Sequence, residues 1–393
     1  FYPILVNKSF GHFFSASLIA AISISSFAQY YFGIVNSLLL AADQKGFVSY
    51  TARIIVLILN TIACSILIYF GCSIQIVKLT TSLIFVARPL FLNWYVKRHY
   101  NIDRKITYVE EPIKQKWNGM AQHFASYVLS STDNIVLTVF SSLENVSIYS
   151  VYNLAISGVK NIVFSLSNGL QALMGNMLVK KETEKLKSFF SYLEWVLHTG
   201  TTLCFGCTGM LIVSFARVYT HGVNDANYIQ PLFAILITVA NAGHCLRLPY
   251  NLLILAAGHY KQTQNNYIIA MVMNIVLSIA TVKIWGLIGV AIGTLVAMLY
   301  QTIWMAWYDS KNIICWPFKN FLKQFAVDII TVLIASVLTY NIPLLSVSYK
   351  AWFIQAIEVF VCWCIVAGVV NYIFYKDILL IAVKKVVSKA RKA

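Results

Sequence analysis

Residues 264–308 read QNNYIIAMVMNIVLSIATVKIWGLIGVAIGTLVAMLYQTIWMAWY, and this stretch decides the class of fold. Lys283 is its only charged residue. Because a helix that crosses a bilayer needs about 20 mostly apolar residues, the stretch predicts two membrane-spanning helices, at 264–283 and 285–308. They are joined by little more than one residue, so they form a tight hairpin.

The rest of the chain has the same character. Of its 393 residues, 59% are hydrophobic and 11% are charged, whereas soluble domains carry about 25% charged residues. A chain of this size with so few charges cannot cover a water-facing surface, so we predict an all-α polytopic membrane protein. About eleven apolar runs are long enough to span a bilayer: 16–40, 54–74, 76–96, 122–141, 147–173, 190–214, 228–252, 264–283, 285–308, 325–344 and 352–375.

The basic residues orient these spans. The net charge of +16 would suggest nucleic acid in a soluble protein, but here the Lys and Arg residues lie in short connections. Alternate connections hold about 23 and about five of them, so the richer set is cytoplasmic and no nucleic-acid partner is expected. The start of the chain then lies outside. Since Phe1-Tyr2-Pro3 shows neither an initiator Met nor a signal peptide, we expect the chain to lack its N-terminal part. An odd number of helices is then missing if the native N-terminus is cytoplasmic.

An internal repeat organises the runs. Asn36-Ser-Leu-Leu-Leu-Ala-Ala42 matches Asn251-Leu-Leu-Ile-Leu-Ala-Ala257, six predicted helices later. An even spacing gives both copies the same orientation, which is the parallel symmetry that some transporters use. We therefore expect two six-helix lobes, the first incomplete, plus two C-terminal helices. The predicted parts are 1–100 (remainder of the first lobe), 101–118 (cytoplasmic linker), 119–308 (second lobe) and 309–393 (two helices and a basic tail).

Charged residues inside the predicted spans need an explanation, because each costs about 2.5–3.5 kcal/mol at the bilayer centre. Asp133 lies within a barely apolar run, and Lys160 lies in the next one. Either a hydrated cavity or a buried Asp133–Lys160 pair accounts for both. Arg88 either reaches the lipid headgroups or offers its guanidinium to a phosphate. Polar residues share a helical face with these charges: Gln122, Ser126 and Ser130 with Asp133, and Tyr149, Asn153 and Ser157 with Lys160.

Other polar residues are weaker candidates. Glu194, His198, Asp328 and Glu358 lie toward the ends of their runs, so we expect them at the membrane interface. Cys204-x-x-Cys207 has a redox or metal spacing, but it has no second pair nearby and is expected to pack as small apolar residues. We expect no metal, no cofactor and no catalytic residues.

The sequence resembles a known family at three places. Ser131-Thr-Asp-Asn-Ile-Val-Leu137 and Val146-Ser-Ile-Tyr-Ser-Val-Tyr-Asn153 resemble the start of the second lobe in bacterial polysaccharide flippases of the O-antigen (Wzx) type, and Leu252-Leu-Ile-Leu-Ala-Ala-Gly258 resembles their later hairpin. These flippases belong to the multidrug/oligosaccharidyl-lipid/polysaccharide exporter superfamily. The resemblance covers most of the chain except its last two helices.

The resemblance implies a function. Such proteins move an undecaprenyl-pyrophosphate-linked oligosaccharide from the cytoplasmic to the outer leaflet of the bacterial inner membrane, for surface polysaccharide synthesis. It implies that Arg88 and Lys160 hold the pyrophosphate, with Tyr149 and Asn153 beside them, and that Asp133 carries a coupling proton or sodium ion. The expected partners are the lipid-linked oligosaccharide, membrane lipids and a polysaccharide polymerase.

Three other functions stay open. A cation-coupled multidrug exporter and a lipid II flippase belong to the same superfamily and share its lobes. A drug exporter is expected to carry more acid and less base in its interior. A membrane-embedded glycan polymerase or glycosyltransferase needs a sizeable outside loop, and every predicted outside connection is short, so we expect a transporter rather than an enzyme.

Overall fold

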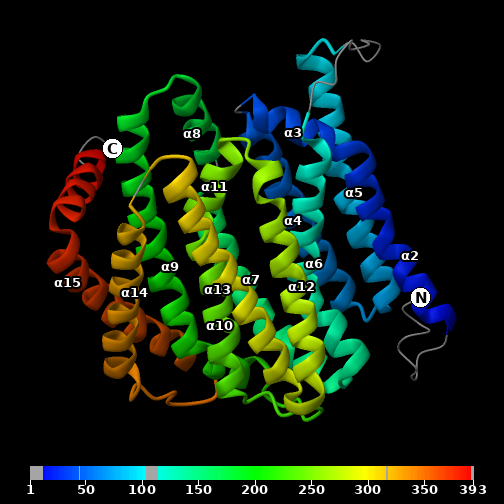
Figure 1. The fold of residues 1–393 in the computed structure, drawn as a ribbon. Helices are drawn as coiled ribbons and strands as arrows, with labels where there is room; N and C mark the ends of the chain where they lie inside the picture. The colour runs from blue at the N-terminus through cyan, green and yellow to red at the C-terminus, as the bar shows by residue number, and fades with distance from the viewer. Residues whose placement is uncertain (1–11, 44, 103–113, 168, 316, 391–393) are drawn as a thin grey trace. The chain divides into compact units, whose positions relative to one another are not determined.

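The protein is an all-helical membrane protein. The computed structural model describes residues 12–43, 45–102, 114–167, 169–315 and 317–390, and every regular element within these ranges is a helix (Figure 1). Within the described residues, ten candidate spans, each a helix or a run of consecutive helical segments, are long and apolar enough to cross a membrane. The predicted fold class, a polytopic helical membrane protein, is therefore confirmed.

The predicted run 122–141 behaves differently from the other ten. It forms α6 (Lys116–Phe140), which is long enough to span a bilayer but is not among the ten apolar spans. Its polar groups are satisfied by the neighbouring α12: Gln122 donates to the carbonyl of Tyr260 at 2.8 Å and to the hydroxyl of Thr263 at 2.7 Å. A helix whose polar side chains bond to other helices does not need an apolar sequence.

The chain forms two compact units, residues 1–112 and 113–393. The predicted linker 101–118 lies largely outside the described residues, and the further division of the second unit at residue 308 stays a prediction. The helical segments of the first unit are α2 (His12–Ala28), a π-helical segment (Gln29–Gly33), α3 (Ile34–Ala42), α4 (Gly46–Tyr69) and α5 (Ile74–His99).

In the first unit, α2 and α4 both pack against α5. A small core of Leu40, Val48, Leu92 and Val96 lies between α3, α4 and α5. Pro89 interrupts the hydrogen-bond ladder of α5, since proline has no N–H and displaces a backbone carbonyl. The interruption lies where the π-helical segment packs on α5.

The second unit contains ten helices in the part of the chain described. They are α6, α7 (Leu143–Leu166), α8 (Leu170–Val179), α9 (Thr183–Tyr219), α10 (Pro231–Leu246), α11 (Leu248–Ala256), α12 (Tyr260–Trp285), α13 (Leu287–Asn312), α14 (Phe318–Thr339) and α15 (Tyr349–Ala390). Two pairs, α7 with α8 and α10 with α11, each form one candidate span. α15 bends at Tyr375, where the backbone leaves the helical region.

Two of the hydrophobic cores of the second unit connect most of its helices. The larger one includes Tyr152, Phe190 and Phe233, from α7, α9 and α10. The smaller one lies where α14 and α15 pack against α9 (Figure 1), around the fully buried Trp363. A Cβ on Gly206 of α9 would come within 1.8 Å of the Trp363 ring, so only glycine lets α15 approach this closely.

The repeated sequences form similar helices. α3 and α11 are both nine-residue helices that end at an Ala-Ala pair, and each is followed after a short turn by a long helix, α4 or α12. Each also follows an irregular segment: the π-helical segment precedes α3, and the break at Arg247 precedes α11. The local structure therefore agrees with the repeat, and the pairing of two six-helix lobes stays a prediction.

Candidate functional site

Asp133 lies inside the second unit, where α6, α7 and α13 meet. Its side chain is 3% exposed. Thr294 of α13 donates to its Oδ1 at 2.7 Å, and Tyr149 of α7 donates to its Oδ2 at 3.3 Å. Since an isolated carboxylate is costly to bury, these two hydroxyls partly satisfy it. The burial expected from the sequence is therefore observed.

Two polar side chains of α12 lie close to Thr294: Asn274 contacts its hydroxyl, and Ser278 packs against the preceding residue, Gly293. Asn274 of α12 donates its amide N–H to the Thr294 hydroxyl at 2.9 Å. Its carbonyl oxygen and the hydroxyl of Ser278, one helical turn away, are buried and have no hydrogen-bond partner within the described residues. A carboxylate, an amide oxygen and hydroxyls are the oxygen ligands that hard cations prefer. The side chains present therefore suit a proton or a small cation.

Lys160 does not pair with Asp133. Its ammonium donates to Asn241 of α10 at 3.4 Å, and among the described residues no salt bridge joins it to a carboxylate. It stays within electrostatic range of Asp133. Of the two explanations that the sequence left open, the direct buried pair is not formed, because the Lys160 side chain turns toward α10.

A second cation, and this one buried, lies within electrostatic range of Lys160. Arg247, at the break between α10 and α11, is 5% exposed and contacts the Met298 sulfur at 3.7 Å and the His244 ring. Arg247 is one of the about 23 basic residues predicted for the cytoplasmic connections, and this prediction is wrong for its side chain. Pro249 begins α11 within two residues, so the break turns the guanidinium into the bundle. Pro249 is the sequence signal for this break.

These groups form the basic cluster: Lys160, His244 and Arg247. His244 lies within electrostatic range of both Lys160 and Arg247. Within the described ranges, none of the three forms an ion pair with a carboxylate. The buried salt bridge there joins His198 to Asp328 instead. Lys160 and Arg247 are two cations without an anionic partner among the described residues, so this place in the bundle suits an anionic group.

The predicted polar faces of α6 and α7 are only partly formed. On α6, Gln122 and Asp133 are buried, whereas Ser130 is exposed. On α7, Tyr149 contacts Asp133, while Asn153 is half-buried and accepts from Ser157 at 3.3 Å. Tyr149 therefore joins the acidic site. Asn153 lies two turns from Lys160, and the structure gives it only a neighbour on its own helix.

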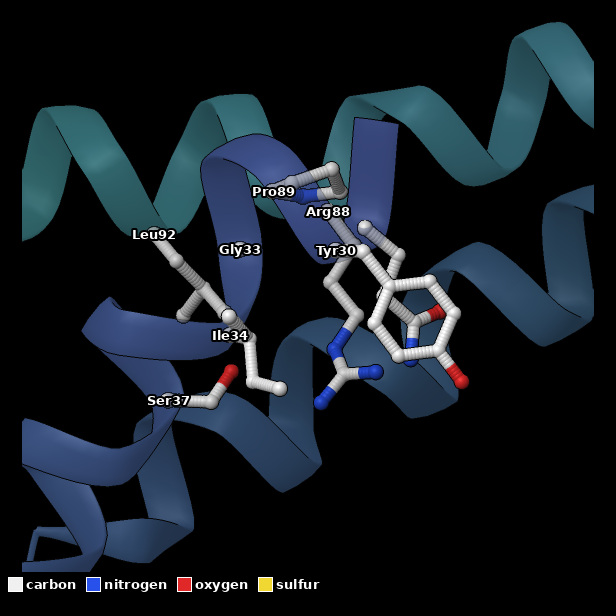
Figure 2. A pocket seen from close by; sticks show the side chains of 8 residues that line it. Tyr30, Gly33, Ile34, Ser37, Arg88, Pro89 and Leu92 are labelled. Carbon is white, nitrogen blue, oxygen red and sulfur yellow. The ribbon is translucent and has the colours of Figure 1, made fainter. Parts of the chain in front are cut away.

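Arg88 belongs to the first unit. It lines a cavity of about 120 Å³ together with Tyr30 and Ser37, and in the view of Figure 2 its guanidinium lies between these two side chains. Its Nη2 donates to Ser49 of α4 at 2.9 Å, and its Nε is buried with no partner among the described residues of this unit. The side chain thus points into the unit rather than along the helix toward the headgroups.

A second arginine accompanies Arg88. Arg53 follows Ser49 by one turn of α4, which places it on the same side of that helix, and it lies within electrostatic range of Arg88. In the part of the first unit that is described, neither arginine forms a salt bridge with a carboxylate. Two neighbouring guanidinium groups are the arrangement that binds phosphate oxygens.

An apolar cavity of about 470 Å³ lies beside α9, α10 and α14. Side chains such as Phe205, Val239 and Leu333 line it, and Trp363 closes one side. Asp328 is the one carboxylate among its lining residues. A cavity of this shape and polarity fits a hydrocarbon chain.

Three residues expected at the membrane interface are instead buried in the second unit. Glu194, His198 and Asp328 are 4%, 0% and 6% exposed, while Glu358 is exposed as expected for a surface residue. The expectation was wrong for the first three because α9 extends over 37 residues and other helices cover its N-terminal half. The i, i+4 spacing of Glu194 and His198 was the available signal.

The fold is one that membrane flippases use. A search of solved structures matches the chain to lipid II flippase MurJ in its inward closed conformation, with a TM-score of 0.61 and 15% sequence identity. The match covers 95% of this chain and 78% of that one. At this identity the likeness shows the fold alone, and the matched protein is a transporter rather than an enzyme. No family model and no curated protein matches the sequence.

Proposed function

We propose that the protein is a flippase for a lipid-linked oligosaccharide, which it moves from the cytoplasmic to the outer leaflet of the bacterial cytoplasmic membrane by alternating access. The observation that carries the proposal is the basic cluster of Lys160, His244 and Arg247, in which Arg247 is buried and the other two are half-buried, and which lacks a carboxylate partner in the described residues. A pyrophosphate supplies the anion that such a cluster lacks.

Both units contribute cations to this proposal. In the first unit, Arg88 with Arg53 offers hydrogen-bond donors beside a small cavity. In the second, Lys160 and Arg247 supply positive charge. Charge-assisted hydrogen bonds to phosphate are about twice as strong as neutral ones, so these groups account for recognition of the pyrophosphate whatever sugars are attached to it.

The apolar cavity supports a lipid-linked substrate. Its lining is almost entirely hydrocarbon, from residues such as Phe205 and Leu333. An undecaprenyl chain is the part of the proposed substrate that such a lining fits, since burying apolar surface contributes about 25 cal/mol per Å². A small water-soluble sugar would gain little there.

Asp133 is the proposed coupling residue. Its carboxylate is held by Thr294 and Tyr149, and Thr294 also contacts Asn274, whose carbonyl oxygen has no partner among the described residues. A proton or sodium ion bound here neutralises the carboxylate. Because the site joins α6 and α12 to α13, occupancy of the site changes the relative stability of different helix arrangements.

A lipid II flippase is the second candidate, and the structural match to such a protein favours it. A multidrug exporter is the third. The sequence argument against an exporter rested on a single acid among the membrane charges, but the structure buries Glu194, Asp309 and Asp328 as well. The number of buried acids therefore does not distinguish a flippase from a multidrug exporter. Only the transported substrate distinguishes them.

The test is transport by the purified full-length protein in lipid vesicles. Three substrates are compared: an undecaprenyl-pyrophosphate-linked oligosaccharide, lipid II, and a cationic dye. Movement of the first across the bilayer under a proton or sodium gradient supports the proposal. Movement of lipid II alone replaces it with the second candidate, and movement of the dye alone replaces it with an exporter.

A cellular test addresses the proposed pathway. In a bacterium that lacks its own O-antigen or capsule flippase, the full-length protein is expected to restore surface glycan when the matching glycan enzymes and polymerase are present. Absence of surface glycan, with the protein shown to be in the membrane, contradicts the proposed pathway. It leaves the lipid II candidate open.

A further inference from the structure

A second network of buried polar groups lies away from Asp133, where α9, α11, α13 and α14 meet (Figure 1). Tyr250 donates to Glu194 Oε1 at 2.6 Å, and its oxygen lies 3.1 Å from His198 Nε2. His198 Nδ1 lies 2.7 Å from Asp328 Oδ2. The four side chains form a continuous chain of contacts through the interior of the second unit.

The number of protons in this chain can be counted. The Tyr250 hydroxyl has one proton and gives it to Glu194, so its oxygen can only accept, and His198 Nε2 carries hydrogen. The contact between His198 Nδ1 and Asp328 then shares one further proton, which lies on either residue. Each of the three contacts is therefore a hydrogen bond whose proton belongs to a titratable side chain. Hydrogen bonds linked in this way polarise one another, so a change of charge at one end affects the whole chain.

Asp309 of α13 lies beside this chain and differs from its members. It is 1% exposed, and neither carboxylate oxygen has a hydrogen-bond partner in the part of the chain that the structure describes. The titratable groups within its electrostatic range are Glu194 of α9, Tyr250 of α11, Tyr267 of α12 and Tyr308 of its own helix. None of these is a cation.

An ionised carboxylate in this position has no compensation. Desolvation opposes its charge, and the neighbouring Glu194 opposes it further, because like charges disfavour each other in a medium of low polarity. Binding a proton removes the charge of the carboxylate, and with it both of these unfavourable effects.

We infer that Asp309 is a second proton-binding site, separate from Asp133, and that the chain Glu194–Tyr250–His198–Asp328 connects it to the apolar cavity. Asp328 lines that cavity, so the far end of the chain borders a space beside α14. Proton binding converts the Asp309 carboxylate to a carboxylic acid and removes one negative charge beside Glu194. The inference does not depend on which substrate the protein carries.

Infrared difference spectroscopy on the purified full-length protein in lipid vesicles tests this site without any substrate. The expected observation is a carbonyl stretch of a buried carboxylic acid at neutral pH that disappears on raising the pH. Asp309→Asn is expected to remove this band. The matched control Glu358→Gln, an exposed carboxylate on α15, is expected to leave it unchanged.

Two further samples guard the interpretation. Asp309→Glu is the alternative variant if Asp309→Asn does not fold. It keeps a carboxyl group, so it is expected to show the carbonyl band at a shifted position. Tyr250→Phe breaks the chain and is expected to shift the pH at which the band disappears. A wild-type protein without the band, a band that persists in Asp309→Asn, or loss of the band when sodium is added at constant pH overturns the inference. Loss of transport with an unchanged band instead counts only against the proposed function.

Discussion

Thr294 of α13 donates its hydroxyl proton to Asp133 of α6 at 2.7 Å. Because the same hydroxyl accepts from Asn274 of α12, one threonine joins three helices around a buried carboxylate. The Val290 carbonyl is an alternative acceptor for the same proton, at 3.2 Å. The Thr294 proton can therefore leave Asp133 when a cation takes its place, without being left unpaired.

Thr294→Val is expected to destabilise the protein by about 1–3 kcal/mol, because it removes a donor to a buried carboxylate while keeping the side-chain shape. Thermal unfolding of the protein in detergent measures this change. Thr238→Val is the matched control, since the Thr238 hydroxyl is equally buried but has no partner among the described residues. Equal stability of the two variants contradicts the assigned role of Thr294.

Lys160→Gln is expected to weaken binding of a pyrophosphate-linked lipid about ten- to a hundredfold, since one charge-assisted hydrogen bond contributes about 1.5–3 kcal/mol. The dissociation constant is measured with the purified protein and a labelled lipid. Lys283→Gln removes an exposed lysine on α12 and is expected to leave the affinity unchanged. If both variants bind as the wild type does, the basic cluster is not the pyrophosphate site.

Gly206→Ala is expected to cost about 1–3 kcal/mol of stability, because the new methyl group overlaps the Trp363 ring and forces α15 away from α9. Gly200→Ala, on the same helix, is the control. A Cβ at Gly200 meets nothing within 4 Å, so alanine there is expected to be neutral or to stabilise by up to about 1 kcal/mol. The melting temperatures of the two variants measure these changes in stability. A Gly206→Ala protein as stable as the wild type contradicts the close packing of α9 against Trp363 of α15.

The turn after α3 is expected to respond to pH. Hydrogen bonds from Lys45 and then from Tyr100 hold the pKa of Asp43 below its ordinary value of 3.8. A carboxyl group whose pKa is lowered by folding stabilises the folded state at any pH above its unfolded-state pKa. This stabilisation is lost below about pH 4, as the pH falls through the folded-state pKa.

Tyr100→Phe is expected to raise the pKa of Asp43 toward 3.8, because it removes one of these two donors. Carbon NMR of protein labelled at the aspartate carboxyl groups follows the titration. Tyr69→Phe, at an exposed tyrosine on α4, serves as the control. An Asp43 titration that is the same in all three proteins contradicts the assigned contact.

The membrane spans were predictable because bilayer thickness sets one length for all of them. The same logic identified Asp133, since a carboxylate in the middle of a run stands out whatever surrounds it. The partner of Lys160 was not predictable. Depth along a helix follows from counting residues, but the rotation of α7 relative to α10 depends on packing between segments about 80 residues apart, and the sequence of one helix does not encode it.

The missed residues share a cause. Glu194, Asp309 and Asp328 lie toward the ends of apolar runs, and a residue in that position is ordinarily at the headgroups. Here neighbouring helices cover them: Tyr250 of α11 contacts Glu194, and His198 of α9 contacts Asp328. Burial of this kind arises from tertiary contacts, so hydropathy along the chain gives no sign of it.

The central claim is that cation binding at Asp133 drives movement of a lipid-linked pyrophosphate, and Asp133→Asn tests it most directly. The measurement is the rate at which the lipid-linked oligosaccharide crosses vesicle membranes, with and without a proton or sodium gradient, alongside its binding affinity. We predict that the variant binds the lipid as the wild type does but shows no acceleration by either gradient. Gradient-driven transport at the wild-type rate in Asp133→Asn would contradict the account.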